Sequence, residues 1–219
     1  MAEIDNPDFE RDVLFEINGL AERLPGRMRD AVTFVGEYGL PFVLVALVVL
    51  GWLLVRRRSD APQAVAGCCW ALVAAGLAWS ANMPIRAFVA RPRPYDSHAE
   101  LIPMVDGKDG YSFVSDHAGV AMAIAVALFL VHRVLGLVAL GLALLQGAAR
   151  VLMGVHYPTD VVGGFALGMA VALLLAPLGM ALLTPLVRAV AGVGWFGWLA
   201  RPPEDDPEQE RGAGERLAA

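Results

Sequence analysis

The stretch "GLPFVLVALVVLGWLLVRRRS", residues 39–59, decides the fold class. It carries no charged side chain until three consecutive arginines, Arg56, Arg57 and Arg58, end it. About 20 apolar residues are needed to cross the hydrocarbon core of a bilayer, and arginines gather at the cytoplasmic end of a span. We therefore expect a membrane span over about residues 38–55, with Arg56 at the cytoplasmic side.

The composition of the whole chain agrees with a membrane protein. Of its 219 residues, 57% are hydrophobic and 18% are charged, whereas soluble domains carry about 25% charged residues. The net charge of −5 argues against a nucleic-acid-binding protein. Cys68 and Cys69 are adjacent inside an apolar block, so we interpret them as packing residues.

Further apolar blocks predict a polytopic, all-α transmembrane bundle of five to six spans. After the first span, four more are expected at about residues 62–83, 117–131, 134–152 and 160–178. A last apolar stretch, 180–199, is either a sixth span or a surface helix.

Three regions follow from this pattern. Residues 1–37 are expected to form N-terminal amphipathic helices, because Phe9, Val13, Ile17 and Leu20 recur at helical spacing. The first of these helices either lies in the membrane interface or packs on the rest of the protein. Residues 38–199 form the membrane domain, and residues 200–219 an acidic, disordered tail.

Counting spans from Arg56 places two polar segments on the same, extracytoplasmic face: residues 84–116 and residues 150–160. Arg86, Arg91 and Arg93 then lie on the outer side, where basic residues are normally few. We interpret Arg91 as a side chain that extends to the lipid headgroups. The position of Arg86 and Arg93 on the outer side needs another explanation.

We expect Arg86 and Arg93 to bind an anion, because further polar residues are predicted on the same face. The three stretches involved are "RAFVARPRP" (86–94), "SFVSDHAG" (112–119) and "ARVLMGVHYPTD" (149–160). Apart from Arg91, they supply three arginines, two histidines and two acidic residues, namely Arg86, Arg93, Arg150, His117, His156, Asp116 and Asp160, together with Ser115.

This set suits phosphoryl transfer without a metal ion. Guanidinium groups bind phosphate oxygens in pairs of hydrogen bonds and offset the charge of the transition state. The helix expected to begin near Ser115 directs backbone N–H groups at an anion. One histidine can act as nucleophile with a carboxylate behind it, and the second can protonate the leaving oxygen.

Other polar residues receive simpler interpretations. His98 and His132 are expected at the membrane interface. The loop 95–112 is expected to cover the pocket, and its acidic residues lack the spacing of a metal site. We therefore expect no metal and no cofactor.

The three stretches resemble the signature of the type 2 phosphatidic acid phosphatase superfamily, which reads Lys-x6-Arg-Pro, Pro-Ser-Gly-His and Ser-Arg-x5-His-x3-Asp. The third motif keeps Arg150, His156 and Asp160 at the family spacing. Four positions differ: Arg86 replaces lysine, Ala149 replaces serine, and Val114 and Asp116 replace the proline and glycine of the second motif. The "SDH" sequence is similar to the bacterial undecaprenyl-diphosphate phosphatases.

The resemblance implies a role for each matching residue. His156 would attack phosphorus and form a phosphohistidine, Asp160 would orient His156, and His117 would serve as acid and then base. The phosphoryl oxygens would be bound by Arg86, Arg93, Arg150 and Ser115. We place Asp116 with the substrate-binding residues. Because its charge opposes an anion, we expect its side chain to cap the third span or to pair with an arginine.

The expected activity is hydrolysis of undecaprenyl diphosphate to undecaprenyl phosphate by an integral cell-membrane protein, at its extracytoplasmic side. Phosphatidic acid and phosphatidylglycerophosphate are alternative substrates for the same chemistry. A lipid-phosphate or anion transporter is a remote alternative, since it would not need two histidines. The expected partners are the lipid phosphate or diphosphate and membrane lipids; the oligomeric state is not predicted.

Overall fold

The computed structural model describes residues 8–105 and 110–200, which form helices and connecting loops with no strand among them. The all-α prediction is confirmed. The helices are α1 (Asp8–Glu22), α2 (Gly26–Phe34), the π-helix η1 (Val35–Gly39), α3 (Leu40–Val55), α4 (Ala61–Val89), α5 (Pro94–Ser97), α6 (Asp116–Val131), α7 (Arg133–Leu152), α8 (Pro158–Leu174), α9 (Ala176–Ala191) and the 3-10 helix η2 (Gly194–Leu199). The expected acidic tail lies almost wholly outside the described residues.

Three of the described helices are long and apolar enough to cross a membrane: residues 26–55, 61–97 and 133–152. The pair α8 and α9 passes the same criterion together, although the two are bent by 54° at their junction. Helix α6 is apolar but has only 16 residues. The protein is thus an integral membrane protein, while the expected count of five to six spans is not confirmed.

The first long helix is continuous from α2 through η1 to α3, a length of 30 residues. Its middle is a π turn, in which the backbone N–H of Leu40 donates to the carbonyl of Val35, five residues earlier. The expected boundary between residues 37 and 38 therefore falls within an unbroken helix. The division into regions stays a prediction.

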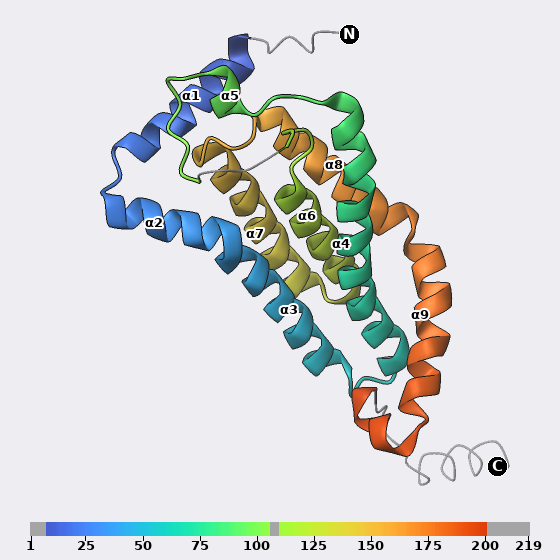
Figure 1. Ribbon diagram of the computed structural model, residues 1–219. Helices are drawn as coiled ribbons and strands as arrows, with labels where there is room; N and C mark the ends of the chain where they lie inside the picture. Colours follow the sequence, from blue (N-terminus) through green and yellow to red (C-terminus); the bar gives the residue numbers. More distant parts are fainter. Residues whose placement is uncertain (1–7, 106–109, 201–219) are drawn as a thin grey trace, which may run out of the picture.

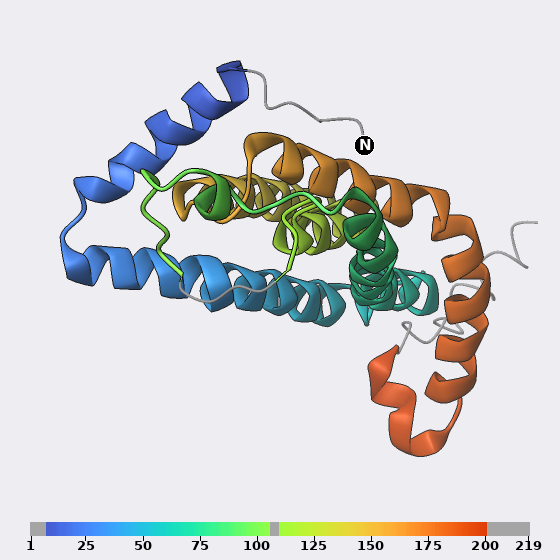
Figure 2. The same cartoon turned by 45° about the horizontal axis from the view of Figure 1, so that its top comes forward.

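The bundle brings the polar segments to one end. The loops that follow α4 and α7 lie together at the top of Figure 1, beside α1 and α5, and the α3–α4 and α6–α7 turns lie at the other end. Figure 2 shows the described segments between α5 and α6, residues 98–105 and 110–115, at the polar end of the bundle. The arginines that follow α3 are at the opposite end, as the sequence predicts.

Helix α6 is the centre of the bundle and packs on α4, α7 and α8. Its alanines are almost completely buried. The crossing with α8 is close because both helices carry glycine there: a Cβ on Gly168 would lie 2.1 Å from the carbonyl oxygen of Gly119. This contact brings the start of α6 against the start of α8, where Ser115 and Asp160 lie.

Helix α1 packs on the rest of the protein, but not through its apolar stripe. Its buried residues are Glu10, Leu14, Asn18 and Ala21, whereas the side chains of Phe9 and Leu20 are exposed. Asn18 donates to the carbonyl of Leu152 at 2.9 Å, which fixes α1 to the end of α7. Of the two alternatives for this helix, the structure shows α1 packed on the rest of the protein, through Leu14 and Ala21 together with the polar side chains of Glu10 and Asn18.

Candidate active site

His156 lies in the short loop between α7 and α8 and is buried. Its Nδ1 is 2.9 Å from the carbonyl oxygen of Ser112 and 3.7 Å from Oδ2 of Asp160. A carbonyl oxygen only accepts, so Nδ1 carries the proton. The lone pair of the neutral ring is then on Nε2, as a nucleophilic histidine requires.

Its surroundings keep this imidazole neutral. The pKa of His156 is lowered from 6.5 to about 4, chiefly because burial disfavours the charged ring. Asp160 opposes the shift, while the positive charges of Arg150 and Arg93 add to it.

Asp160 begins α8 and is fully buried. Its Oδ2 accepts from the backbone N–H of Tyr157 at 2.8 Å, and its Oδ1 accepts from Nη1 of Arg91 at 2.9 Å. Asp160 therefore holds the loop that carries His156, in addition to facing the imidazole.

Arg91 does not extend to the lipid headgroups, so that interpretation is wrong. Its side chain is buried, and Nη2 donates to Glu10 of α1 at 2.8 Å. Its guanidinium also lies 3.8 Å from the centre of the Tyr157 ring. Two carboxylates, Glu10 and Asp160, satisfy the charge of Arg91 inside the protein.

Arg150 is fully buried at the end of α7. Its Nη1 pairs with Oε1 of Glu37 in η1. Its Nε and Nη2 are also buried and have no hydrogen-bond partner among the described residues. These two N–H groups form the edge of a guanidinium that suits a phosphate or carboxylate.

Arg93 and Arg86 complete a cluster of three positive charges. Arg93 is buried, and its Nη1 donates to the carbonyl of Val155, the residue before His156, at 3.1 Å. The charges of Arg86 and Arg150 act on Arg93. Arg86 and Arg150 are each paired with a carboxylate, so the group that indicates an anion site is the buried Nε–Nη2 edge of Arg150, which has no partner among the described residues.

Asp116 faces Arg86 and forms an ion pair with it. It also accepts from the side-chain amide of Asn82. Of the two roles expected for Asp116, the structure shows the pairing with an arginine. Ser115, not Asp116, caps α6, because its Oγ accepts from the backbone N–H of Ala118 at 3.4 Å.

The second motif is tied directly to the third. The backbone N–H of Ser115 donates to the carbonyl of Asp160 at 3.0 Å. His117 follows in the first turn of α6, and its Nε2 lies 3.8 Å from Oε2 of Glu37. The structure thus brings Arg86, Arg93, His117, Arg150, His156 and Asp160 to the same end of the bundle.

Comparison with known proteins agrees with this geometry. A family model described as the PAP2 superfamily matches residues 64–183. The chain belongs to the PAP2 superfamily. The match runs from α4 into α9 and contains every residue of the three motifs.

Three similar proteins show the range of PAP2 phosphatases around this chain. Undecaprenyl-diphosphatase BcrC of Bacillus subtilis is 31% identical over 165 residues, 74% of this chain and 80% of the relative. Decaprenylphosphoryl-5-phosphoribose phosphatase of Mycobacterium tuberculosis is 33% identical over 179 residues, 79% of this chain and 92% of the relative. The crystal structure of a transmembrane PAP2 type phosphatidylglycerolphosphate phosphatase from Bacillus subtilis superposes with a TM-score of 0.55 at 22% identity, over 83% of this chain and 90% of that one. The resemblance to the undecaprenyl-diphosphate phosphatase branch is confirmed.

Sequence reasoning missed three residues of this PAP2 site: Glu10, Glu37 and Asn82. Glu37 and Asn82 have largely apolar neighbours on their helices, whereas Glu10 stands among charged residues of α1. A buried polar group in a membrane protein usually has a function. That signal was present for Glu37, which stands beside the first span. None of the three belongs to the family signature.

The sequence predicts no metal site and predicts that the loop 95–112 covers the pocket. Within residues 8–105 and 110–200, no group of three or more His, Cys, Asp or Glu side chains is placed to hold a metal ion. The described part of the loop is tied down, since Ile102 donates to Asn18 of α1 and Met104 donates to the carbonyl of Met153. Residues 106–109 of this loop lie outside the described residues, and its role as a cover stays a prediction.

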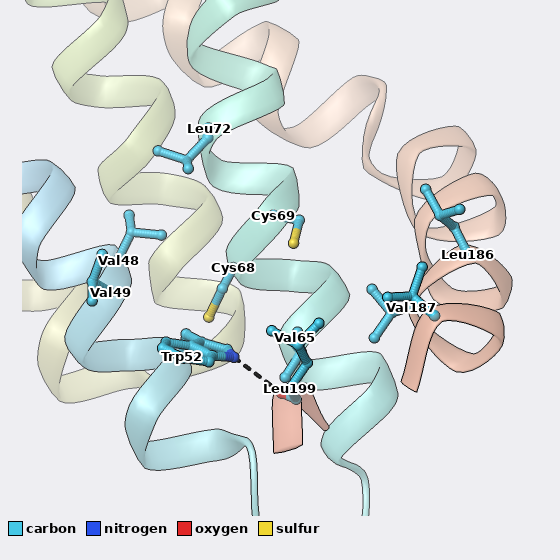
Figure 3. A pocket seen from close by; sticks show the side chains of 11 residues that line it. Val48, Val49, Trp52, Val65, Cys68, Cys69, Leu72, Leu186, Val187 and Leu199 are labelled. Carbon is cyan, nitrogen blue, oxygen red and sulfur yellow. Dashed lines mark hydrogen bonds between the residues drawn. The ribbon is translucent and has the colours of Figure 1, made fainter. Parts of the chain in front are cut away.

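An apolar hollow of about 440 Å³ lies away from this site, between α3, α4 and α9. Figure 3 shows Cys68 and Cys69 on its wall, with the indole of Trp52 donating to the carbonyl of Leu199 at 3.0 Å. Its lining is almost entirely aliphatic and aromatic. It offers no charged group to a phosphate, so the phosphoryl chemistry belongs to the polar end of the bundle.

Proposed function

We propose that this PAP2 protein removes the terminal phosphate of undecaprenyl diphosphate through a phosphohistidine at His156. The observation that carries the proposal is the placement of the imidazole: Nδ1 of the buried ring is held by the carbonyl of Ser112, and Arg93 donates to the carbonyl of Val155, the residue before His156. A neutral nitrogen beside clustered cations suits nucleophilic attack on an anionic phosphoryl group.

In the first step, the lone pair on Nε2 of His156 attacks the terminal phosphorus. The bond from phosphorus to the bridging oxygen breaks, and His117 gives a proton to the oxygen of the departing lipid phosphate. In the second step, His117 takes a proton from water, the water oxygen attacks phosphorus, and the N–P bond breaks. The products are undecaprenyl phosphate and inorganic phosphate.

The arginines bind the phosphoryl oxygens in both steps. The Nε and Nη2 groups of Arg150 provide two parallel donors, and Arg93 and Arg86 contribute further positive charge. Charge increases on the oxygens in the transition state, and fixed guanidinium groups stabilise it without a metal ion. Ser115 contributes through its position at the N-terminus of α6.

The substrate assignment is supported by the similarity to BcrC and by the "SDH" sequence at Ser115–His117. We place the reaction at the extracytoplasmic face, because Arg56, Arg57 and Arg58 lie at the opposite end of the bundle. Phosphatidylglycerophosphate is the second candidate, since the fold matches a solved phosphatase with that substrate in its name.

A phosphate-release assay on a lipid panel tests the proposal. Purified protein in detergent with EDTA is given undecaprenyl diphosphate, phosphatidylglycerophosphate and phosphatidic acid at equal concentration. We expect release without added metal, the highest kcat/KM for undecaprenyl diphosphate, and loss of release in His156→Ala and His117→Ala. Loss of wild-type activity in EDTA would contradict the metal-free mechanism, and a preference for a glycerophospholipid would change the substrate.

A further inference from the structure

Glu37 is a carboxylate that belongs to no motif, yet it lies between two residues of the proposed mechanism. One oxygen pairs with Nη1 of Arg150, and the other lies 3.8 Å from Nε2 of His117. Its side chain is only 12% exposed. A carboxylate so close to an anion site opposes binding of the substrate, so its presence needs an explanation.

The backbone around Glu37 holds its side chain in this position. Glu37 is the central residue of the π turn η1, and π turns occur frequently at functional sites. The carbonyl of the preceding Gly36 accepts from the buried side-chain amide of Gln146 at 2.7 Å. Gln146 lies four residues before Arg150 on the same face of α7. One contact therefore fixes Glu37 relative to Arg150.

Glu37 and phosphate do not compete for the same edge of Arg150. Glu37 uses Nη1, whereas Nε and Nη2 are the groups with no partner among the described residues. A phosphoryl group can bind the Nε–Nη2 edge while Glu37 keeps its contact. Glu37 also supplies the countercharge that a fully buried guanidinium needs before the substrate arrives.

The second oxygen of Glu37 acts on His117. A carboxylate beside an imidazole favours its protonated form, and only that form can give a proton to the leaving group. We propose that Glu37 is a positioning residue, which orients Arg150 for the phosphoryl oxygens and keeps His117 oriented and charged as the acid. This inference rests on the proposed function.

The test compares two water-soluble substrates, p-nitrophenyl phosphate and phenyl phosphate. Both present the same phosphoryl group, but phenolate is the poorer leaving group and depends more on a proton donor. Glu37→Gln retains an oxygen that can accept from Arg150 and removes the charge that faces His117. We expect kcat/KM for phenyl phosphate to fall at least about 10-fold more than that for p-nitrophenyl phosphate. Asp30→Asn, an exposed carboxylate of α2, is the matched control and should change neither value.

A second variant keeps the test decisive if Glu37→Gln does not fold. Gln146→Met removes the donor to the Gly36 carbonyl and leaves Glu37 in the chain, so the ratio between the two substrates should move in the same direction. Equal losses on both substrates, or no loss, would overturn the inference. Neither result bears on the proposed function, which depends on phosphate release by the wild type and its absence in His156→Ala.

Discussion

His156 has two neighbours that share the control of its ring. The carbonyl of Ser112 is closer to Nδ1 than the carboxylate of Asp160 is, at 2.9 Å against 3.7 Å. The family resemblance implies that Asp160 orients the imidazole. The structure adds a backbone carbonyl from a loop 44 residues away, a contact that no local motif could reveal.

The burial of His156 predicts a pH dependence of stability. Its pKa is about 4 in the folded protein and 6.5 as a free side chain, so below pH 6.5 the unfolded chain binds the additional proton. The folded protein keeps its full stability above pH 6.5, where the ring of His156 is neutral in the folded and the unfolded chain. As the pH falls from 6.5 toward 4, the unfolded chain takes up the proton first and the folded protein loses stability. His156→Gln removes the titrating ring and can still donate to Ser112. Thermal unfolding in detergent should show a larger fall in Tm between pH 6.5 and 4.5 for the wild type than for the variant; parallel curves would contradict this account.

Two departures from the family signature have partners in the structure. Val114 stands where the signature has proline, and its backbone N–H, which proline lacks, donates to Oδ1 of Asn82 at 3.3 Å. Asn82 in turn donates to the carbonyl of Val114 and to Asp116. The nonstandard residues therefore form a group with Asn82, although nothing in the structure explains the replacement of serine by Ala149.

At the scale of elements, the crossing of α6 and α8 depends on glycine. A Cβ at Gly168 would meet the carbonyl oxygen of Gly119 at 2.1 Å, so Gly168→Ala should push the helices apart and destabilise the protein by about 1–3 kcal/mol. It should also lower kcat, because Ser115 on α6 donates to Asp160 on α8. Gly141→Ala on α7 is the control, since a Cβ there meets nothing within 4 Å. Equal unfolding temperatures for the two variants would contradict the packing argument.

The docking of α1 depends on Glu10, which is buried and accepts from Arg91 and from the backbone N–H of Thr159. Glu10→Ala leaves part of the charge of Arg91 uncompensated inside the protein and should cost about 3 kcal/mol. We also expect a lower kcat, since Arg91 holds Asp160 as well. Glu16→Ala, on the exposed face of α1, is the control. A similar Tm for both variants would show that α1 does not support the site.

Hydropathy predicted most helix positions well, because a block of apolar residues is a local property. The expected span 134–152 is α7 almost residue for residue. Hydropathy could not show the buried face of α1, since Asn18 and Glu10 on that face are held by partners on distant segments, the carbonyl of Leu152 and the guanidinium of Arg91.

For the whole molecule, the sequence predicted that distant polar segments meet on one face, and the structure places them there. The spacing of the third motif identified Arg150, His156 and Asp160. Counting membrane spans from Arg56 predicted that the first two motifs lie on the same face as the third. Glu37 was missed and Arg91 was misinterpreted because ion pairs between remote helices leave no spacing pattern in the chain. The site therefore has a core that motifs identify and a surrounding set of charges that only the fold reveals.

The most direct test of the central claim is to trap the covalent intermediate. Wild-type protein is mixed with substrate labelled with ³²P in the terminal phosphate, quenched in alkali within the first turnover and digested. The account predicts label on the peptide that contains His156, stable to alkali and released by acid, and none in His156→Ala. Label on another residue, or wild-type turnover by His156→Ala, would contradict it.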